Sequence, residues 1–267
     1  MIKILKNSNL VIIVFFCLLA FVEAGKLWGQ QSHTPAEVPS SRVLTQIREI
    51  LQLPNKEADE GQPVRVQAVV TFYEGRAYRG LMILFIHDSS GGIFVREGSA
   101  QEDLNLTPGD LVEVKGVTAH GFLRNEIRKP EVHTLGRAPL PDPRHPRPDQ
   151  LVLGRLDCEW VEITGFVTST QVEEPSKRLI LDVTEGEERV KVVVLKYPQR
   201  APTDLLHAKV RFQGVCGGNY NAKNEMTGIL IRVQDISFVH NLGTGPSAEE
   251  SPPAESSREL ASLNARR

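Results

Sequence analysis

The chain has 267 residues, of which 40% are hydrophobic and 24% charged, and its formal net charge is −2 at pH 7. This composition is ordinary for a globular protein of one or two domains. It excludes a broadly basic surface, so the charge gives no support to polyanion binding.

The N-terminus predicts an export signal over residues 1–24. Lys3 and Lys6 precede an unbroken apolar run at residues 10–22, and Val22-Glu23-Ala24 resembles a small-residue cleavage site. The run is shorter than the ~20 residues needed to span a bilayer, which favours a cleaved signal over an anchor. We therefore expect a periplasmic or extracellular chain with no transmembrane span after cleavage. An uncleaved signal would anchor it through residues 10–22.

Residues 25–62 predict a tether followed by a short docking helix. Apolar residues recur at three- and four-residue steps from Leu44 to Leu51, and Pro54 ends the pattern. A serine at position 40 or 41 is the expected cap. So short a helix is not stable alone in water, so its apolar stripe should dock on the first folded domain.

Two segments occur twice in the chain. Residues 63–71 share their alternating apolar pattern with residues 160–168, and residues 111–117 share theirs with residues 209–215. The offsets, 97 and 98 residues, are nearly equal. Because alternation is typical of half-buried strands, this predicts two homologous all-β domains, at residues 63–136 and 156–241.

Each repeat predicts five short strands without alternating helices, a pattern typical of a small closed barrel. A turn signal at residues 88–92 joins the second and third strands of the first repeat. Residues 137–155 form a proline-rich linker that should act as a stiff spacer, and residues 242–267 have the composition of a disordered tail. The expected strands are 64–73, 81–87, 92–96, 111–117 and 126–135, then 160–169, 179–183, 189–195, 209–215 and 229–238.

Cys158 and Cys216 are the cysteines that remain after signal removal. Cys158 opens the first strand of the second repeat and Cys216 ends its fourth, so an antiparallel pairing would bring them together. Side-chain parity opposes a bond, because Cys216 shares the phase of Phe212 whereas Cys158 shares that of Glu162. Two alternatives stay open: a disulfide, or two separate, partly buried thiols.

The sequence predicts no catalytic residue, metal site or cofactor. The seven histidines show no paired spacing on one element, and neither cysteine belongs to a Cys-x-x-Cys pair. The glycine-rich phosphate loop, the dinucleotide fingerprint and the serine nucleophile elbow are all missing from the sequence. Asp88 is best explained as a turn-capping residue.

Small five-stranded barrels bind ligands along strands two and three and through the loops joining strands one to two and four to five. In the first repeat these loops interleave aromatic rings with arginines, which could stack on flat rings and hold an anionic group. The alternative is a solvated rim with two tyrosines packed on the barrel mouth. The corresponding loops of the second repeat are nearly neutral, which suggests a spacer role. The candidate ligand-binding residues are Tyr73, Arg76, Tyr78, Arg79, Phe122, Arg124 and Arg128, with His120 and Lys129 beside them.

Four segments, at residues 61–71, 84–95, 109–118 and 157–162, resemble tandem OB-fold modules. Such modules form the extracytoplasmic sensor region of certain large bacterial histidine kinases. The resemblance implies two OB-fold barrels in an exported protein that binds a ligand or a partner. No phosphoacceptor histidine context or nucleotide-binding glycine box occurs, so kinase activity is not implied, and no family ligand residue can be transferred.

The leading interpretation is therefore an exported, non-catalytic OB-fold module that binds a small molecule or protein partner, or a detached sensor region. A single-stranded nucleic-acid-binding protein is the first alternative, supported by fold analogy but opposed by the charge and the export signal. A structural spacer or interaction scaffold is the second.

Overall fold

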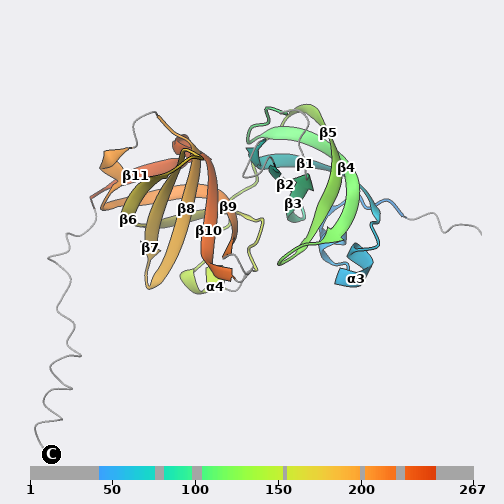
Figure 1. Ribbon diagram of the computed structural model, residues 1–267, viewed down its shortest axis with the longest axis horizontal. Helices are drawn as coiled ribbons and strands as arrows, with labels where there is room; N and C mark the ends of the chain where they lie inside the picture. Colours follow the sequence, from blue (N-terminus) through green and yellow to red (C-terminus); the bar gives the residue numbers. More distant parts are fainter. Residues whose placement is uncertain are drawn as a thin grey trace, which may run out of the picture. The chain divides into compact units, whose positions relative to one another are not determined.

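The computed structural model describes residues 42–75, 81–97, 104–152, 155–198, 202–220 and 226–244. The chain divides into residues 1–41 and 42–267, and every described residue belongs to the second unit. The expected signal and most of the tether and tail lie outside the described residues. Figure 1 shows that the described part consists mainly of strands wrapped into two barrels.

The first barrel closes in the order β1-β2-β3-β5-β4. All its ladders are antiparallel except the short parallel pairing between β3 and β5. Alternate residues of β1, from Val64 to Val70, point into the core, as the period of a strand requires. Its strands are β1 (Pro63–Glu74), β2 (Met82–Asp88), β3 (Gly91–Glu97), β4 (Asp110–His120) and β5 (Asn125–Arg137).

The second barrel repeats this topology. Its strands pair as β6-β7-β8-β10-β9, β9 returns to β6, and the β8–β10 pairing is parallel like that of β3 with β5. The prediction of tandem five-stranded, all-β OB-like barrels is confirmed. The strands are β6 (Trp160–Glu173), β7 (Arg178–Glu185), β8 (Glu188–Lys196), β9 (Ala208–Tyr220), β10 (Met226–Asp235) and β11 (Val239–Thr244).

The last predicted strand, 229–238, is in fact interrupted. Asp235 accepts a hydrogen bond from the Ser237 amide, and the 3-10 turn η4 (Ile236–Phe238) follows. The chain then re-enters the sheet as β11, which pairs with the first half of β9 and extends to Thr244. In the first barrel one long strand, β5, pairs along all of β4 instead.

Short helices flank the sheets. The docking helix lies within the range predicted for it, but its N-terminal cap is a different residue. Helix α2 (Ile47–Leu51) begins after Gln46, which forms a capping box with Glu49, so a serine at position 40 or 41 is not its cap. Ile47 and Ile50 are fully buried in the first core. Asp88 accepts the Ile47 amide at 2.9 Å and the Ser90 amide at 2.7 Å, so it caps both helix and turn. The others are α3 (Asn55–Ala58), α4 (Pro148–Val152) and η3 (Thr203–Leu205).

The two barrels are in direct contact, so the linker is not a spacer that holds them apart. Phe72 and Phe85 of the first barrel share a buried cluster with Trp160 and Val215 of the second. The Gln234 side chain exchanges two hydrogen bonds with the backbone of Tyr73, at 2.8 and 3.0 Å. The linker itself adds a bridge to β6, through the backbone of Arg144 on either side of Val161.

The tightest contact lies at Gly92 on β3. A Cβ atom placed there would stand 1.9 Å from the carbonyl oxygen of Cys158, far inside van der Waals contact. The lead-in to the second barrel therefore packs directly on the backbone of the first, and only glycine leaves room for it.

We expect Gly92→Ala to lower the free energy of unfolding by about 1–3 kcal/mol, because the added methyl group overpacks this contact. Urea unfolding followed by circular dichroism measures the change. Gly228→Ala is the matched control: it lies on a strand with no atom within 4 Å of the added Cβ, and it should be neutral or slightly stabilising. Equal stability of both variants would show that the contact is not tight.

Candidate ligand-binding site

The outer face of β2 and β3 carries aromatic and basic side chains. Leu84 and Ile86 point into the first core, and so do Ile93 and Val95, so the alternate positions face outward. These outward positions include Ile83 and Phe85 on β2 and Phe94 and Arg96 on β3. The face predicted from the barrel type is therefore partly aromatic.

The rings and guanidinium on this face contact one another. Phe85 and Phe94 are stacked, with centroids 5.0 Å apart. Arg96 lies 5.2 Å from the Phe94 centroid and 5.8 Å from that of Phe122, which is 56% exposed on the β4–β5 loop. A buried carboxylate, Glu126, holds Arg96 at 3.2 Å and Arg128 at 2.7 Å. The Arg96 Nε is buried without a hydrogen-bond partner among the described residues.

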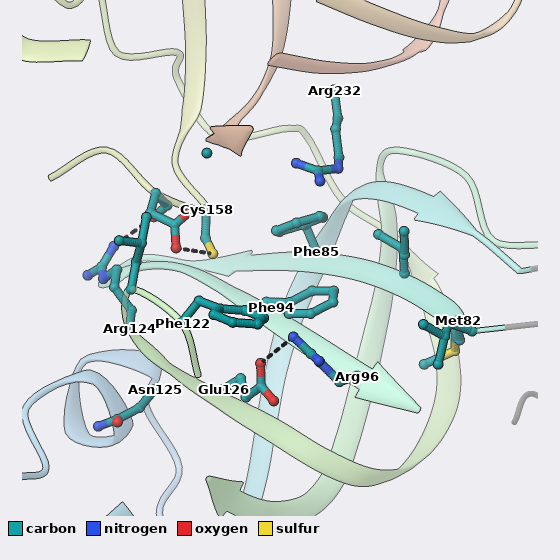
Figure 2. A pocket seen from close by; sticks show the side chains of 15 residues that line it. Met82, Phe85, Phe94, Arg96, Phe122, Arg124, Asn125, Glu126, Cys158 and Arg232 are labelled. Carbon is teal, nitrogen blue, oxygen red and sulfur yellow. Dashed lines mark hydrogen bonds and ion pairs between the residues drawn. The ribbon is translucent and has the colours of Figure 1, made fainter. Parts of the chain in front are cut away.

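A cavity of about 260 Å³ lies over this face, and both barrels line it. The first barrel supplies Phe85, Phe94, Arg96 and the loop residues Phe122 to Arg124. Figure 2 shows the three phenylalanine rings on one side and the guanidinium of Arg232 facing Phe85 from the other. Arg232 lies 5.5 Å from the Phe85 centroid. The second half of the chain thus contributes to the cavity, through Asp157, Cys158, Gly218 and Arg232.

Burial sets the electrostatics of the cavity wall. It lowers the pKa of the Arg232 guanidinium, while Asp157 nearby acts in the opposite direction. Burial also raises the pKa of Asp157, against the hydrogen bond from Cys158 and the charges of Arg124 and Arg232. The pKa of the Cys158 thiol is raised well above its ordinary value, first by burial and then by Asp157. Cys158 is therefore protonated at neutral pH and a weak nucleophile.

Glu159, next to the cavity, ties three parts of the chain together. Its carboxylate lies 3.3 Å from His87 of β2, 2.9 Å from Arg144 of the linker and 3.7 Å from Arg124 of the β4–β5 loop. Burial by itself would raise the pKa of this carboxyl, but His87 and Arg144 lower it to about 2. Arg124 also donates to the carbonyl of Asp157 at 2.8 Å.

Only some of the predicted ligand-binding residues line the cavity. Phe122 and Arg124 line the cavity, and Arg128 lies beside it on Glu126. His120 and Lys129 do not line it. Arg76, Tyr78 and Arg79 lie outside the described residues, so their role stays a prediction.

Tyr73, expected in the ligand-binding loop after the first strand, lies in β1 and faces the first core. It is 4% exposed in the first core, and its hydroxyl accepts the Leu104 amide at 2.9 Å. The register of β1 shifts between Val70 and Phe72, which is a β-bulge. Since a bulge reverses the alternation, Phe72 faces outward to the second barrel and Tyr73 faces inward.

Cys158 and Cys216 are free buried thiols, so the disulfide does not form in this structure. The strand ends meet as expected, with the Cys158 amide 2.8 Å from the Cys216 carbonyl. Their side chains diverge, because Cys216 packs in the second core and Cys158 in the cluster between the barrels. The opposite side-chain phases of the two cysteines are therefore what keeps them apart. Burial raises the pKa of Cys216 to about 12.

Sequence reasoning missed Phe85, Phe94, Arg96 and Arg232 as cavity residues. For the first three a signal was present: aromatic and basic residues at positions opposite in phase to the apolar core of β2 and β3. Arg232 had no such signal, because its approach to Phe85 depends on how the second barrel docks.

Within the described ranges, no three His, Cys, Asp or Glu side chains gather closely enough to hold a metal ion. In the same part of the chain, no helix has the length and apolar character to cross a bilayer.

No protein-family model matches the sequence, and no curated protein matches it either. Among solved structures, the chain is similar to the HINa domain of Ifi202 in complex with a 20-bp double-stranded DNA, at 11% identity and a TM-score of 0.34. That alignment covers 68% of this chain and 96% of the other. A murine DNA binding protein bound with double-stranded DNA gives 13% identity, coverages of 72% and 99%, and a TM-score of 0.35.

A replication protein A heterotrimer bound to single-stranded DNA gives 14% identity, coverages of 80% and 54%, and a TM-score of 0.33. At such low TM-scores, these likenesses carry no information about the ligand of this chain.

We expect the pH dependence of stability to reveal Glu159. Its pKa is lowered from 4.5 to about 2 in the folded chain, so its stabilising contribution is present above pH 4.5 and is lost as the pH falls toward 2. Glu159→Gln should lower stability at pH 7 by roughly 1–3 kcal/mol, because Glu159 is buried and its partners lose a charged acceptor. It should also flatten the decline in stability below pH 4.5.

Urea unfolding at pH 7, 4 and 3 measures both effects. Glu187→Gln, at an exposed position of the β7–β8 turn, is the control and should retain the wild-type profile. An unchanged acid profile in Glu159→Gln would contradict the assignment.

Proposed function

We propose that this chain is a non-catalytic OB-fold binding protein that holds a ligand with a planar ring in the cavity between its barrels. The observation that carries the proposal is the arrangement of Phe94, Arg96 and Phe122. Two rings and a guanidinium plane converge there on one wall of a cavity. Aromatic and guanidinium faces stack on flat rings.

The size of the cavity favours a small ligand. At about 260 Å³, it is slightly smaller than the range of roughly 300–1,000 Å³ typical of sites for drug-sized ligands. Phe122 is the exposed member of the set, so its ring is open to a ligand. The guanidinium of Arg96 lies beside it, 5.8 Å from the ring centroid, and extends this flat surface.

Residues 1–24 support an exported form of this binding protein, on the sequence argument given above. In that setting the chain would act outside the cytoplasm, as a sensory module or as a detached sensor region. The contact between the barrels suits a sensor, because a ligand touching both barrels would change the strength of that contact.

Single-stranded nucleic acid is a second candidate, favoured by the position of the rings. Phe94 and Arg96 lie on the second and third strands of the barrel and Phe122 on the loop between the fourth and fifth, the surfaces through which OB folds bind oligonucleotides. The second barrel, however, covers the Phe85 end of this face. A strand of many nucleotides could therefore not run along the whole face, and the net charge of −2 adds no attraction.

We expect Phe94→Ala and Phe122→Ala each to weaken ligand binding about 5- to 100-fold, because each removes a stacking surface. The affinities of the wild-type chain and the variants are measured by calorimetry, with thymidine monophosphate and a ten-nucleotide oligodeoxythymidylate as probes. Leu135→Ala, at a 49% exposed position of β5 away from the cavity, is the matched control.

Binding that survives both phenylalanine substitutions would contradict the proposed site. Tighter binding of the oligonucleotide with a steep loss of affinity in salt would favour the nucleic-acid candidate. Equal binding of the two probes, with little salt dependence, would favour the small ligand.

A further inference from the structure

We infer that Arg232 forms an anion-binding subsite, so that the ligand carries a phosphate group beside its planar ring. This inference rests on the proposed function and deepens it by naming the ligand class: a small aromatic phosphate, such as a nucleoside monophosphate. The subsite comes from the second barrel, whereas the ring-binding wall comes from the first.

The fold directs Arg232 out of its own barrel. Its neighbours on β10, Ile231 and Val233, are fully buried in the second core, so the alternation of the strand turns Arg232 to the opposite side. There it meets Phe85 of the first barrel, 5.5 Å from the ring centroid, and lines the cavity.

The charge of Arg232 is poorly compensated. The side chain is mostly buried, and guanidinium groups in such positions are normally paired with a carboxylate. Among the described residues, Arg232 forms no ion pair with a carboxylate. The acidic groups that act on its charge are Asp157, Cys158 and Glu74, in that order, and none of them forms an ion pair with it. Glu74 is itself paired with Arg178. An anion in the cavity would supply the missing partner.

The other charged groups at this end do not cancel the subsite. Asp157 lines the cavity and opposes an anion, but Arg124 lies beside it and donates to its carbonyl. Glu159 is already surrounded by His87, Arg144 and Arg124. The guanidinium of Arg232 therefore remains available to a ligand.

The ring-binding side chains and Arg232 would bind two different parts of the ligand, its ring and its phosphate. Arg232 faces Phe85, Phe85 stacks on Phe94, and Arg96 covers Phe94 and approaches Phe122. Figure 2 shows these side chains in that sequence around the cavity. A ring placed against the exposed face of Phe122 would extend a substituent toward Arg232, whose planar fork suits a phosphate.

The test compares thymidine with thymidine monophosphate by calorimetry on the full chain, with inorganic phosphate as a separate probe. We expect the wild type to bind the monophosphate at least 10-fold more tightly than thymidine. Arg232→Gln should reduce this ratio to about one while leaving thymidine binding unchanged. Arg211→Gln, at an exposed position of β9 outside the cavity, is the matched control and should keep the wild-type ratio.

Asp157→Asn provides a second variant that does not depend on the folding of Arg232→Gln. It removes the opposing carboxylate and should raise the affinity for the monophosphate several-fold, with thymidine unaffected. A monophosphate preference that persists in Arg232→Gln, or equal binding of the two probes by the wild type, would overturn the subsite and leave ring binding intact. Failure of the wild type to bind either probe would count against the ring-binding proposal itself.

Discussion

The arrangement of the two barrels depends on one buried carboxylate, that of Glu159. Its three partners, His87, Arg124 and Arg144, come from a strand of the first barrel, from the β4–β5 loop and from the linker, while Glu159 itself stands at the entrance to the second barrel. Buried charges are tolerated only when they are paired, so the three segments must meet at this point. The apolar cluster around Trp160 then fills the remaining contact. Because His87 and Arg124 also border the ring-bearing face, the joint and the cavity share a wall.

The two barrels share a topology but not a surface. The interior positions of both repeats are filled mainly by aliphatic side chains, which suit the narrow interior of a small barrel. The outward positions of β2 and β3 carry Phe85, Phe94 and Arg96, whereas those of β7 and β8 carry Ile180, Lys191 and Val193. Packing therefore constrains the inward positions of both barrels, whereas the outward positions differ between them. The candidate site therefore belongs to an asymmetric pair, in which one barrel offers rings and the other covers them.

The sequence was sufficient for the strands and the repeat, because alternation and turn chemistry are local properties. It failed where the alternation changes phase. A bulge in β1 turned Tyr73 inward and Phe72 outward, and nothing in a run of apolar residues marks where the extra residue falls. The interruption of the last strand at Asp235 was also not predicted, because the sequence does not mark where the strand pattern stops. The part of the cavity contributed by the second barrel could not be predicted at all, because Arg232 and Phe85 meet only through docking, 147 positions apart in the chain. The parity of Cys158 and Cys216, by contrast, correctly opposed a bond.

The glycine at position 92 also determines which surfaces can join. In the first hairpin Gly92 pairs with His87, one step from the turn, and in the second hairpin Arg189 pairs with Thr184 at the same step. Gly92 admits the carbonyl of Cys158 against its backbone, whereas Arg189 places a long, exposed side chain at the equivalent point. The two hairpins therefore present different surfaces to a neighbouring chain: the first accepts a backbone in close contact, and the second carries a cationic side chain at the same point.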